Sequence, residues 1–135
     1  MSTQAPILSA TAQGTTEKLD PVACLDERVR RVATPSRPTA PGRYIEAQGQ
    51  SETLLISLAR GVTHIGRGLA ADLRLDDASV SRRHAILVDH RSGVRLLDDR
   101  SSNGTFVNGR RVLQAELESG DVLGLGRVVL TYLEV

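Results

Sequence analysis

From Arg43 to Val135, the sequence is a succession of short apolar runs separated by glycine, asparagine or aspartate. Nine runs are evident, and each is too short for a typical amphipathic helix. They are RYIEA, TLLISL, VTHIG, LRL, HAILVDH, VRLLD, TFV, DVLGL and VVLTYLEV. A chain of this kind buries its apolar side chains by pairing strands into sheets. The pattern therefore predicts an all-β fold, a two-sheet antiparallel β-sandwich over residues 43–135.

The polarity within individual runs agrees with two packed sheets. Residues 85–88 are apolar at every position, which is typical of a strand covered on both faces. The last run, residues 128–135, is also apolar on both parities over most of its length. Both runs are expected inside the sandwich.

Residues 1–42 differ from the rest of the chain. Prolines at positions 35, 38 and 41 stand among serine, threonine and glycine, so residues 34–42 are expected to be a linker. Before it, Asp20 and Pro21 suit an N-cap and a first helical residue. Apolar residues then recur at nearly helical spacing: Val22, Leu25, Val29 and Val32. We predict a short helix over about residues 21–33 in a flexible N-terminal arm that precedes the folded domain.

Composition argues against a general attraction to polyanions. The net charge is +1, and residues 43–135 carry twelve arginines against twelve aspartates and glutamates, so any anion site must be local. The single cysteine, Cys24, cannot form an internal disulfide, and no apolar run approaches the roughly 18 residues of a membrane span. We therefore expect a soluble, cytoplasmic protein without nucleic-acid or membrane partners, and its oligomeric state is left open.

The loop sequence SVSRRHA raises the question of catalysis, because Ser81 and His84 resemble a nucleophile and its base. Asp98 or Asp99 would then orient the imidazole. The surrounding residues lack the strand-turn-helix pattern of a hydrolase nucleophile, so no catalytic residue is assigned. Instead, His84 is expected to connect neighbouring loops by hydrogen bonds.

Other ligand classes have weaker support. His64 and His90 have no companion carboxylates or thiols at metal-ligand spacing, so neither a metal nor another cofactor is expected. The glycines of GRG and GLGR do not continue into a nucleotide-binding motif. Two arginine pairs, at positions 82–83 and 110–111, keep nucleic acid as an alternative, although three aromatic residues leave no evident stacking platform.

Three short motifs follow one another in the β-rich part of the chain. They are Gly66-Arg67, then Ser81-Arg82-x-His84, then Ser102-Asn103-Gly104-Thr105 followed by Asn108-Gly109. In order and spacing this set resembles the forkhead-associated (FHA) domain, and the resemblance covers roughly residues 43–135. It implies a β-sandwich of about eleven strands whose loops at one end bind phosphothreonine peptides without catalysis.

The resemblance also implies roles for individual residues. Arg67, Ser81, Arg82 and Ser102 are expected to face the phosphate, and Asn103 to hold the main chain of the peptide. This agrees with their chemistry, because a phosphate dianion needs several donors and a guanidinium can hold two oxygens at once. Five residues are expected to support the loops: Gly66, His84, Gly104, Asn108 and Gly109. Two positions depart from the common family pattern: residue 102 is serine where the family often has threonine, and position 82 varies within the family. The resemblance therefore does not predict the affinity for a phosphopeptide.

The sequence thus predicts a non-enzymatic phosphothreonine-peptide module, acting as an adaptor or regulator in Ser/Thr kinase signalling. Its partner would be a phosphothreonine-containing protein, such as a Ser/Thr kinase or its substrate. Thr15 and Thr16 are candidate phosphorylation sites in the arm, and a phosphothreonine there would occupy the protein's own site. The alternative is a nucleic-acid-binding or purely structural interaction domain that does not depend on phosphate.

Overall fold

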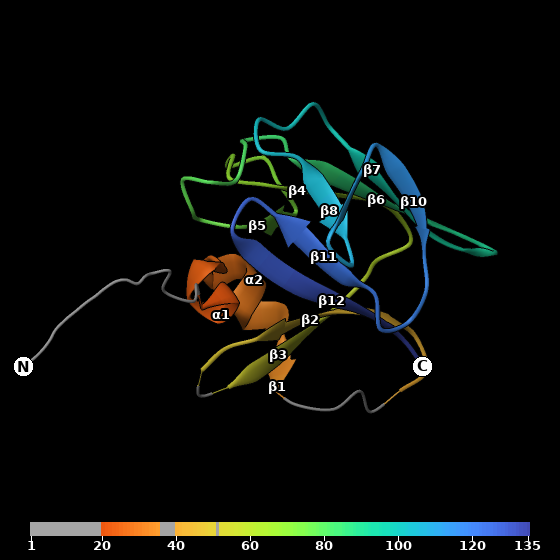
Figure 1. Ribbon diagram of the computed structural model, residues 1–135. Helices are drawn as coiled ribbons and strands as arrows, with labels where there is room; N and C mark the ends of the chain where they lie inside the picture. The colour runs from red at the N-terminus through yellow and green to blue at the C-terminus, as the bar shows by residue number, and fades with distance from the viewer. Residues whose placement is uncertain (1–19, 36–39, 51) are drawn as a thin grey trace, which may run out of the picture.

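A computed structural model describes residues 20–35, 40–50 and 52–135. Within residues 43–135 the chain forms eleven strands, β2 to β12, most of which are labelled in Figure 1. The bounds are β2 Arg43–Gln48, β3 Thr53–Ser57, β4 Gly61–Gly66, β5 Leu73–Arg74, β6 Ala85–His90, β7 Gly93–Asp98, β8 Thr105–Val107, β9 Arg110–Val112, β10 Gln114–Leu117, β11 Val122–Leu125 and β12 Val128–Glu134. The predicted all-β fold is confirmed.

The strands form two sheets that pack face to face. The seven-stranded sheet has the order β1-β3-β2-β12-β11-β8-β9, and the five-stranded sheet has the order β10-β7-β6-β4-β5. Among the described residues the neighbours are antiparallel, with the exception of β4 and β5, which run parallel. Side chains from both sheets fill the space between them, and Ile45, Tyr132, Leu96 and Leu87 are almost completely buried.

Strands β9 and β10 are not among the nine predicted runs. Their sequences, RRV and QAEL, carry charged or polar residues at most positions, and Arg110, Arg111 and Glu116 are exposed. β9 is held by β8 and β10 by β7, so both strands lie at sheet edges. Strands in such positions need few apolar residues, and for that reason the polarity pattern did not reveal them.

The predicted helix over about residues 21–33 is a pair of shorter helices, α1 Pro21–Cys24 and α2 Glu27–Val32. The break lies at Leu25 and Asp26, whose backbones are extended. The Asp26 carboxylate accepts a hydrogen bond from the Val29 N–H at 2.9 Å and so caps a new helix instead of continuing the old one.

The helices are part of the folded body and not an arm outside it. Val22, Cys24, Leu25 and Val29 are buried in the same core cluster as the sandwich, whereas Val32 is exposed. Residues 34–35 of the expected linker form strand β1, which pairs with β3 at the edge of the larger sheet. An edge strand tolerates proline because one side of its backbone needs no partner.

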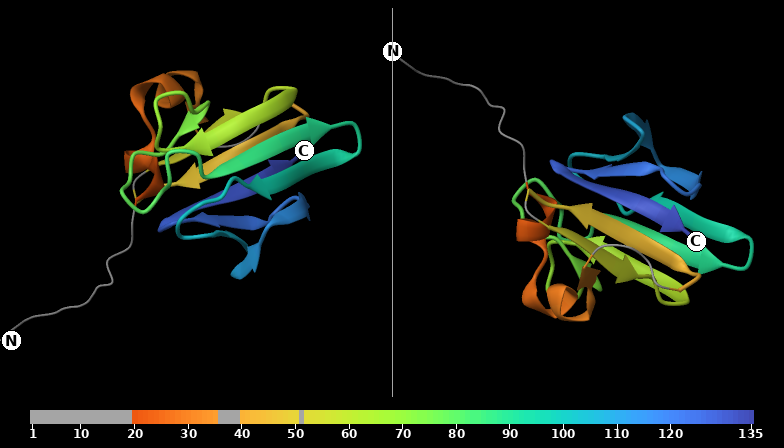
Figure 2. Two further views of the ribbon diagram at one scale, coloured as in Figure 1. Left: turned by 90° about the horizontal axis from the view of Figure 1, so that it is seen from above. Right: turned by 90° about the horizontal axis from the view of Figure 1, so that it is seen from below.

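The two ends of the sandwich differ in what they carry. The loops between β4 and β6 and between β7 and β8 lie at one end, where the helices also pack (Figure 1). The β6–β7 hairpin and the end of β12 lie at the other, as Figure 2 shows from above and below. Thr15 and Thr16 lie outside the described residues, as do linker residues 36–39. No described helix is long and apolar enough to cross a membrane.

Candidate phosphopeptide-binding site

Three loops meet at one end of the sandwich: residues 67–72 after β4, residues 75–84 after β5, and residues 99–104 after β7. Main-chain hydrogen bonds join the first two loops, from the Arg67 N–H to the Ser81 carbonyl at 2.9 Å and from the Gly68 N–H to the Arg82 carbonyl at 3.1 Å. The structure therefore brings the predicted site residues, which are up to 36 positions apart in sequence, into one cluster.

Arg67 follows directly after β4 and is half-buried. Its Nε donates a hydrogen bond to the Val80 carbonyl at 3.0 Å, which fixes the direction of the side chain. None of the ion pairs found among the described residues includes Arg67. The two Nη groups of its guanidinium thus remain available to an anion from outside.

Ser81 and Ser102 lie next to each other although they come from different loops. The Ser81 hydroxyl accepts a hydrogen bond from the Ser102 main-chain N–H at 2.9 Å. The Ser102 side chain is exposed, and its hydroxyl takes no part in that bond. Ser81 Oγ can still donate its own proton, so two hydroxyl donors stand together near Arg67.

Asn103 lies on one flank of these serines. Its Nδ2 donates a hydrogen bond to the Ser79 carbonyl at 2.7 Å, which orients the amide. Ser79 is held in turn by the β11–β12 turn, because its hydroxyl accepts the Arg127 N–H at 2.8 Å. The second amide hydrogen of Asn103 and its carbonyl oxygen are left for a ligand's main chain.

Arg82 follows Ser81 directly, and its side chain is exposed. The Arg82 carbonyl accepts the Gly68 N–H, and a Cβ on Gly66, the last residue of β4, would approach this carbonyl to 2.1 Å. Only glycine therefore fits at position 66 without moving the loop that carries Ser81 and Arg82. The supporting position predicted for Gly66 has a steric reason.

His84 is completely buried and connects the 75–84 loop to the 99–104 loop. Its Nδ1 accepts the Ser81 main-chain N–H at 3.0 Å, and its Nε2 lies 2.9 Å from the Gly104 carbonyl. These partners require a neutral imidazole with the proton on Nε2. Neither ring nitrogen is bonded to the Ser81 hydroxyl, so the geometry does not support a nucleophile and base pair.

Gly104, Asn108 and Gly109 lie where the chain turns. Gly104 has a φ of +89°, and Asn108 and Gly109 have φ values of 52° and +82°. Positive φ at both central residues is characteristic of a type I′ turn, here joining β8 to β9. The Asn108 side chain also accepts the Val122 N–H at 2.9 Å, which connects this turn to β11.

Two carboxylates behind the loops were not among the predicted site residues. Burial raises the pKa of Asp98, but hydrogen bonds from the Ser101 hydroxyl, the Thr105 hydroxyl and the Ser101 N–H outweigh it and leave that pKa lowered. Each donor connects Asp98 to the 99–104 loop or to β8. These partners are close in sequence, because Ser101 lies three positions and Thr105 seven positions after Asp98.

Asp77 has the corresponding role for the 75–84 loop. Burial raises its pKa, and hydrogen bonds from Ser79 and Arg127 outweigh this effect, so the pKa is lowered overall. The contact with Arg127 spans 50 positions in sequence. No local pattern could have predicted it.

Comparison with known proteins agrees with this geometry. Residues 63–126 match the model of the FHA domain. The oxoglutarate dehydrogenase inhibitor of Corynebacterium diphtheriae is 33% identical, over 72% of this chain and 68% of the inhibitor. The ABC transporter ATP-binding/permease protein Rv1747 of Mycobacterium tuberculosis is 34% identical over 78% of this chain, but the match spans only 13% of the transporter.

Among solved structures, one from a structural and functional analysis of phosphothreonine-dependent FHA domain interactions is 34% identical. It superposes with a TM-score of 0.62 and covers 69% of this chain and 96% of its own. The fold, the order of the three motifs and these relatives agree, and the chain belongs to the FHA domain family.

Proposed function

We propose that this protein recognises phosphothreonine peptides without catalysing a reaction, as an adaptor or regulator in Ser/Thr kinase signalling. One observation carries the proposal. Arg67 is oriented through Nε alone and stands beside the hydroxyls of Ser81 and Ser102, with no carboxylate paired to it among the described residues. This combination suits a small, strongly charged anion.

A phosphate monoester has about two negative charges and three acceptor oxygens, so its receptor must replace a full shell of water. The Nη groups of Arg67 supply a planar pair of donors, and Ser81, Ser102 and Arg82 supply the others from separate loops. Asn103 would hold the main chain beside the phosphothreonine. The three loops therefore divide the recognition between phosphate and peptide.

The decisive experiment is a calorimetric titration with matched phosphothreonine, phosphoserine and unmodified peptides. Wild-type protein should bind the phosphothreonine peptide and not the unmodified one, and Arg67→Ala should abolish the difference. Arg91→Ala, an exposed arginine at the far end of the sandwich, is the control and should bind normally. Equal binding of modified and unmodified peptides would reject the proposal.

The same titration separates the alternatives. A nucleic-acid-binding domain would bind an oligonucleotide without any phosphopeptide, with an affinity that falls steeply as salt rises.

For a phosphate ligand the decisive variable is pH, because the second pKa of the phosphate is about 6. Affinity should weaken as the pH falls from 7.5 towards 5.5, and a flat profile would argue against a dianion.

The proposed partner is a protein that carries phosphothreonine, either a Ser/Thr kinase or one of its substrates, in the cytoplasm. This rests on the family and on the chemistry of the loops. Pull-down with a phosphorylated kinase activation segment, before and after phosphatase treatment, would test it. Capture that survives phosphatase would exclude phosphate as the recognised group.

Regulation by the N-terminal residues is also proposed. Phosphothreonine at position 15 or 16 would compete for Arg67 within the same molecule, and Thr16 has Leu19 three residues on. Support comes from the site chemistry and from the helices, which pack beside the loops at residues 75–76. Protein phosphorylated at these threonines should bind peptide more weakly, and undiminished affinity would rule the mechanism out.

A further inference from the structure

The helices α1 and α2 pack beside β5, at the end of the sandwich that carries the three loops (Figure 1). They precede residues 63–126, which match the FHA domain model, and so lie outside the matched region. Their apolar side chains are nevertheless buried in the same core as the sandwich. We call residues 21–32 the helical unit. The phosphate contacts of the proposed function give it no role.

The helical unit holds the start of the 75–84 loop. Leu25 forms an antiparallel bridge with Leu75, and both side chains are buried. The Cys24 carbonyl accepts a hydrogen bond from the Asp76 N–H at 2.6 Å. In turn, the Leu75 N–H donates to the Gly66 carbonyl at 2.9 Å. Leu75 therefore connects the helical unit to the end of β4, directly before the proposed phosphate site.

Arg74 of β5 extends these contacts to Arg67. Its Nε donates a hydrogen bond to the Arg67 carbonyl at 2.9 Å, and its Nη2 lies 3.7 Å from Oδ1 of Asp76. The Asp76 main chain is the group that bonds to the helical unit. The main chain of Arg67 is thus joined to residues 74–76, and these residues are joined to the helical unit.

The contact between α2 and the 67–72 loop is weaker. Arg28 Nη2 donates to the Leu69 carbonyl at 3.4 Å, which is long for a hydrogen bond. A cavity of about 310 Å³ lies between α2 and residues 69–72. The connection from the helical unit to the site therefore runs mainly through residues 24–25 and 74–76.

The helical unit and the 75–84 loop depend on each other for their order. Helices of four and six residues are unstable alone in water, so α1 and α2 form because Val22, Leu25 and Val29 are buried in the core. Once docked, the unit supplies the acceptor for the Asp76 N–H. A loop that is ordered in advance loses less conformational entropy when a ligand binds, and the affinity rises accordingly.

We propose that the helical unit holds the main chain of Arg67 in position for the phosphate, with Arg74 as the positioning residue. Docking of the unit orders residues 74–76, and the Arg74 hydrogen bond transfers this order to Arg67. A segment outside the FHA match thereby sets the affinity of the site, and release of the segment would lower it. The inference rests on the proposed function, because the site that is positioned is the proposed phosphate site.

The first test separates position from charge at residue 74. Arg74→Ala removes the donor to the Arg67 carbonyl and should weaken binding of a phosphothreonine peptide about fivefold. Arg74→Gln removes the charge but keeps an N–H donor at the position of Nε, so its affinity should stay within twofold of wild type. Calorimetric titration measures both. Equal losses in the two variants would assign the effect to charge and overturn the positioning role.

The second test loosens the helical unit in the full chain, at a temperature where circular dichroism shows each variant to be folded. Leu25→Ala truncates a buried side chain and should weaken peptide binding about tenfold. Val29→Ala is a smaller truncation that should act in the same direction, and it serves where Leu25→Ala does not fold. Arg43→Ala is the stability control, because it breaks an ion pair with Asp89 at the other end of the sandwich. It should bind within twofold of wild type.

Hydrogen exchange in the ligand-free protein gives a readout that general destabilisation does not reproduce. The Asp76 N–H bonds to the helical unit, whereas the Tyr132 N–H bonds to the Asp121 carbonyl at 2.9 Å, away from the unit. The exchange rate of Asp76 relative to that of Tyr132 should rise at least tenfold in Leu25→Ala. The ratio should stay unchanged in Arg43→Ala.

The outcomes separate the two proposals. If wild-type protein binds modified and unmodified peptides equally, the proposed function is wrong. If binding depends on phosphate but Leu25→Ala and Val29→Ala lose no more affinity than Arg43→Ala, the positioning inference is overturned. An unchanged exchange ratio in the folded Leu25→Ala or Val29→Ala variant would also overturn it.

Discussion

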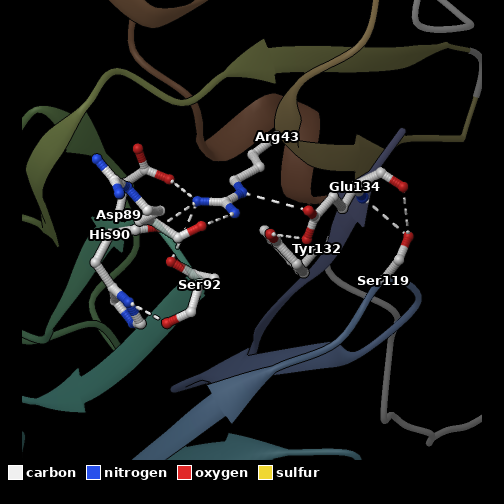
Figure 3. Close-up of polar contacts among 9 residues, drawn as sticks. Arg43, Asp89, His90, Ser92, Ser119, Tyr132 and Glu134 are labelled. Carbon is white, nitrogen blue, oxygen red and sulfur yellow. Dashed lines mark hydrogen bonds and ion pairs between the residues drawn. The ribbon is translucent and has the colours of Figure 1, made fainter.

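The two ends of the sandwich each carry a partly buried arginine, and the two differ in their partners. At the far end, Arg43 of β2 contacts the carboxylates of Asp89 and Glu134 and donates to the carbonyls of His90 and Gly93 (Figure 3). At the loop end, Arg67 donates through Nε to a single carbonyl. Among the described residues, the guanidinium of Arg43 has several internal partners, whereas that of Arg67 has one.

This difference separates a structural arginine from the arginine that we propose to bind the phosphate. Arg43 belongs to the seven-stranded sheet and Asp89 to the five-stranded sheet, so their ion pair joins the two sheets. The Asp89 carboxylate would repel a ligand phosphate. Arg67 has no such neighbour among the described ion pairs, so the proposed phosphate would offset the cost of its partial burial. Composition cannot distinguish the two arginines, but their contacts do.

The largest effect should be on affinity. Arg67→Ala is expected to weaken phosphothreonine-peptide binding at least 100-fold, because it removes a bidentate, charge-assisted contact. Arg43→Ala should change the affinity less than twofold, since its partners all lie at the other end. Calorimetric titration of both variants with one peptide measures the contrast. Similar losses in the two variants would contradict the division of the molecule into two ends.

Thermal stability should respond in the opposite way. Arg43→Ala leaves Asp89 without its cation and leaves several carbonyls without a donor, so Tm should fall by roughly 5–10 °C. Arg67→Ala loses one hydrogen bond and should lower Tm by about half as much or less. Differential scanning calorimetry of both variants at neutral pH measures the two changes in Tm. A larger loss in Arg67→Ala would make Arg67 a structural residue.

The two ends should also lose stability at opposite extremes of pH. At the loop end, the pKa of Asp98 is lower in the folded protein than in the unfolded chain, where it is about 3.9. The ionised Asp98 therefore stabilises the fold above this pH, and its stabilisation is lost as the pH falls through the folded-state pKa. At the far end, burial and then the hydrogen bond to Glu134 raise the pKa of Tyr132 to about 12. Its contribution is present below pH 10 and is lost as the pH rises towards 12.

Urea denaturation across the pH range tests this pair of expectations. Asp98→Asn should flatten the acid limb of the stability profile, and Tyr132→Phe should flatten the alkaline limb. Each variant should leave the other limb unchanged. An alkaline limb that persists in Tyr132→Phe would assign it to another group.

What the sequence could predict depends on how local the determining contacts are. The three loops were predicted from the order and spacing of their motifs, which resemble those of the FHA domain. The Asn108-Gly109 turn follows from backbone geometry over a few residues. The bridging role of His84 was also predicted, from its place at the start of a strand, although its partner Gly104 lies 20 positions away.

Other features depend on contacts that no short window contains. The association of Asp77 with Arg127 joins residues 50 positions apart, and Arg43 meets Asp89 across 46. The helices were expected outside the domain because a short helix is marginal by itself. Their burial depends on the core offered by the two sheets, where Leu25 pairs with Leu75.

The smallest effects are expected for two serines, one at each end of the sandwich, which we compare in the same way as the two arginines. At the loop end, the Ser102 main chain bonds to Ser81 while its hydroxyl stays exposed, so Ser102→Ala should weaken phosphopeptide binding about tenfold and leave stability unchanged. At the far end, the Ser119 hydroxyl accepts the Glu134 N–H at 2.9 Å (Figure 3). Ser119→Ala should therefore cost about 1 kcal/mol of stability and leave binding intact.

Ser102→Thr completes the comparison, because it keeps the hydroxyl and adds one methyl at an exposed position. Its affinity should stay within threefold of wild type. Titration and urea denaturation of the three variants give both quantities for each. If Ser102→Ala lowers the free energy of unfolding as much as the free energy of binding, the Ser102 hydroxyl supports the loop and does not contact the phosphate. The serine of the loop end would then have the same structural role as Ser119 at the far end.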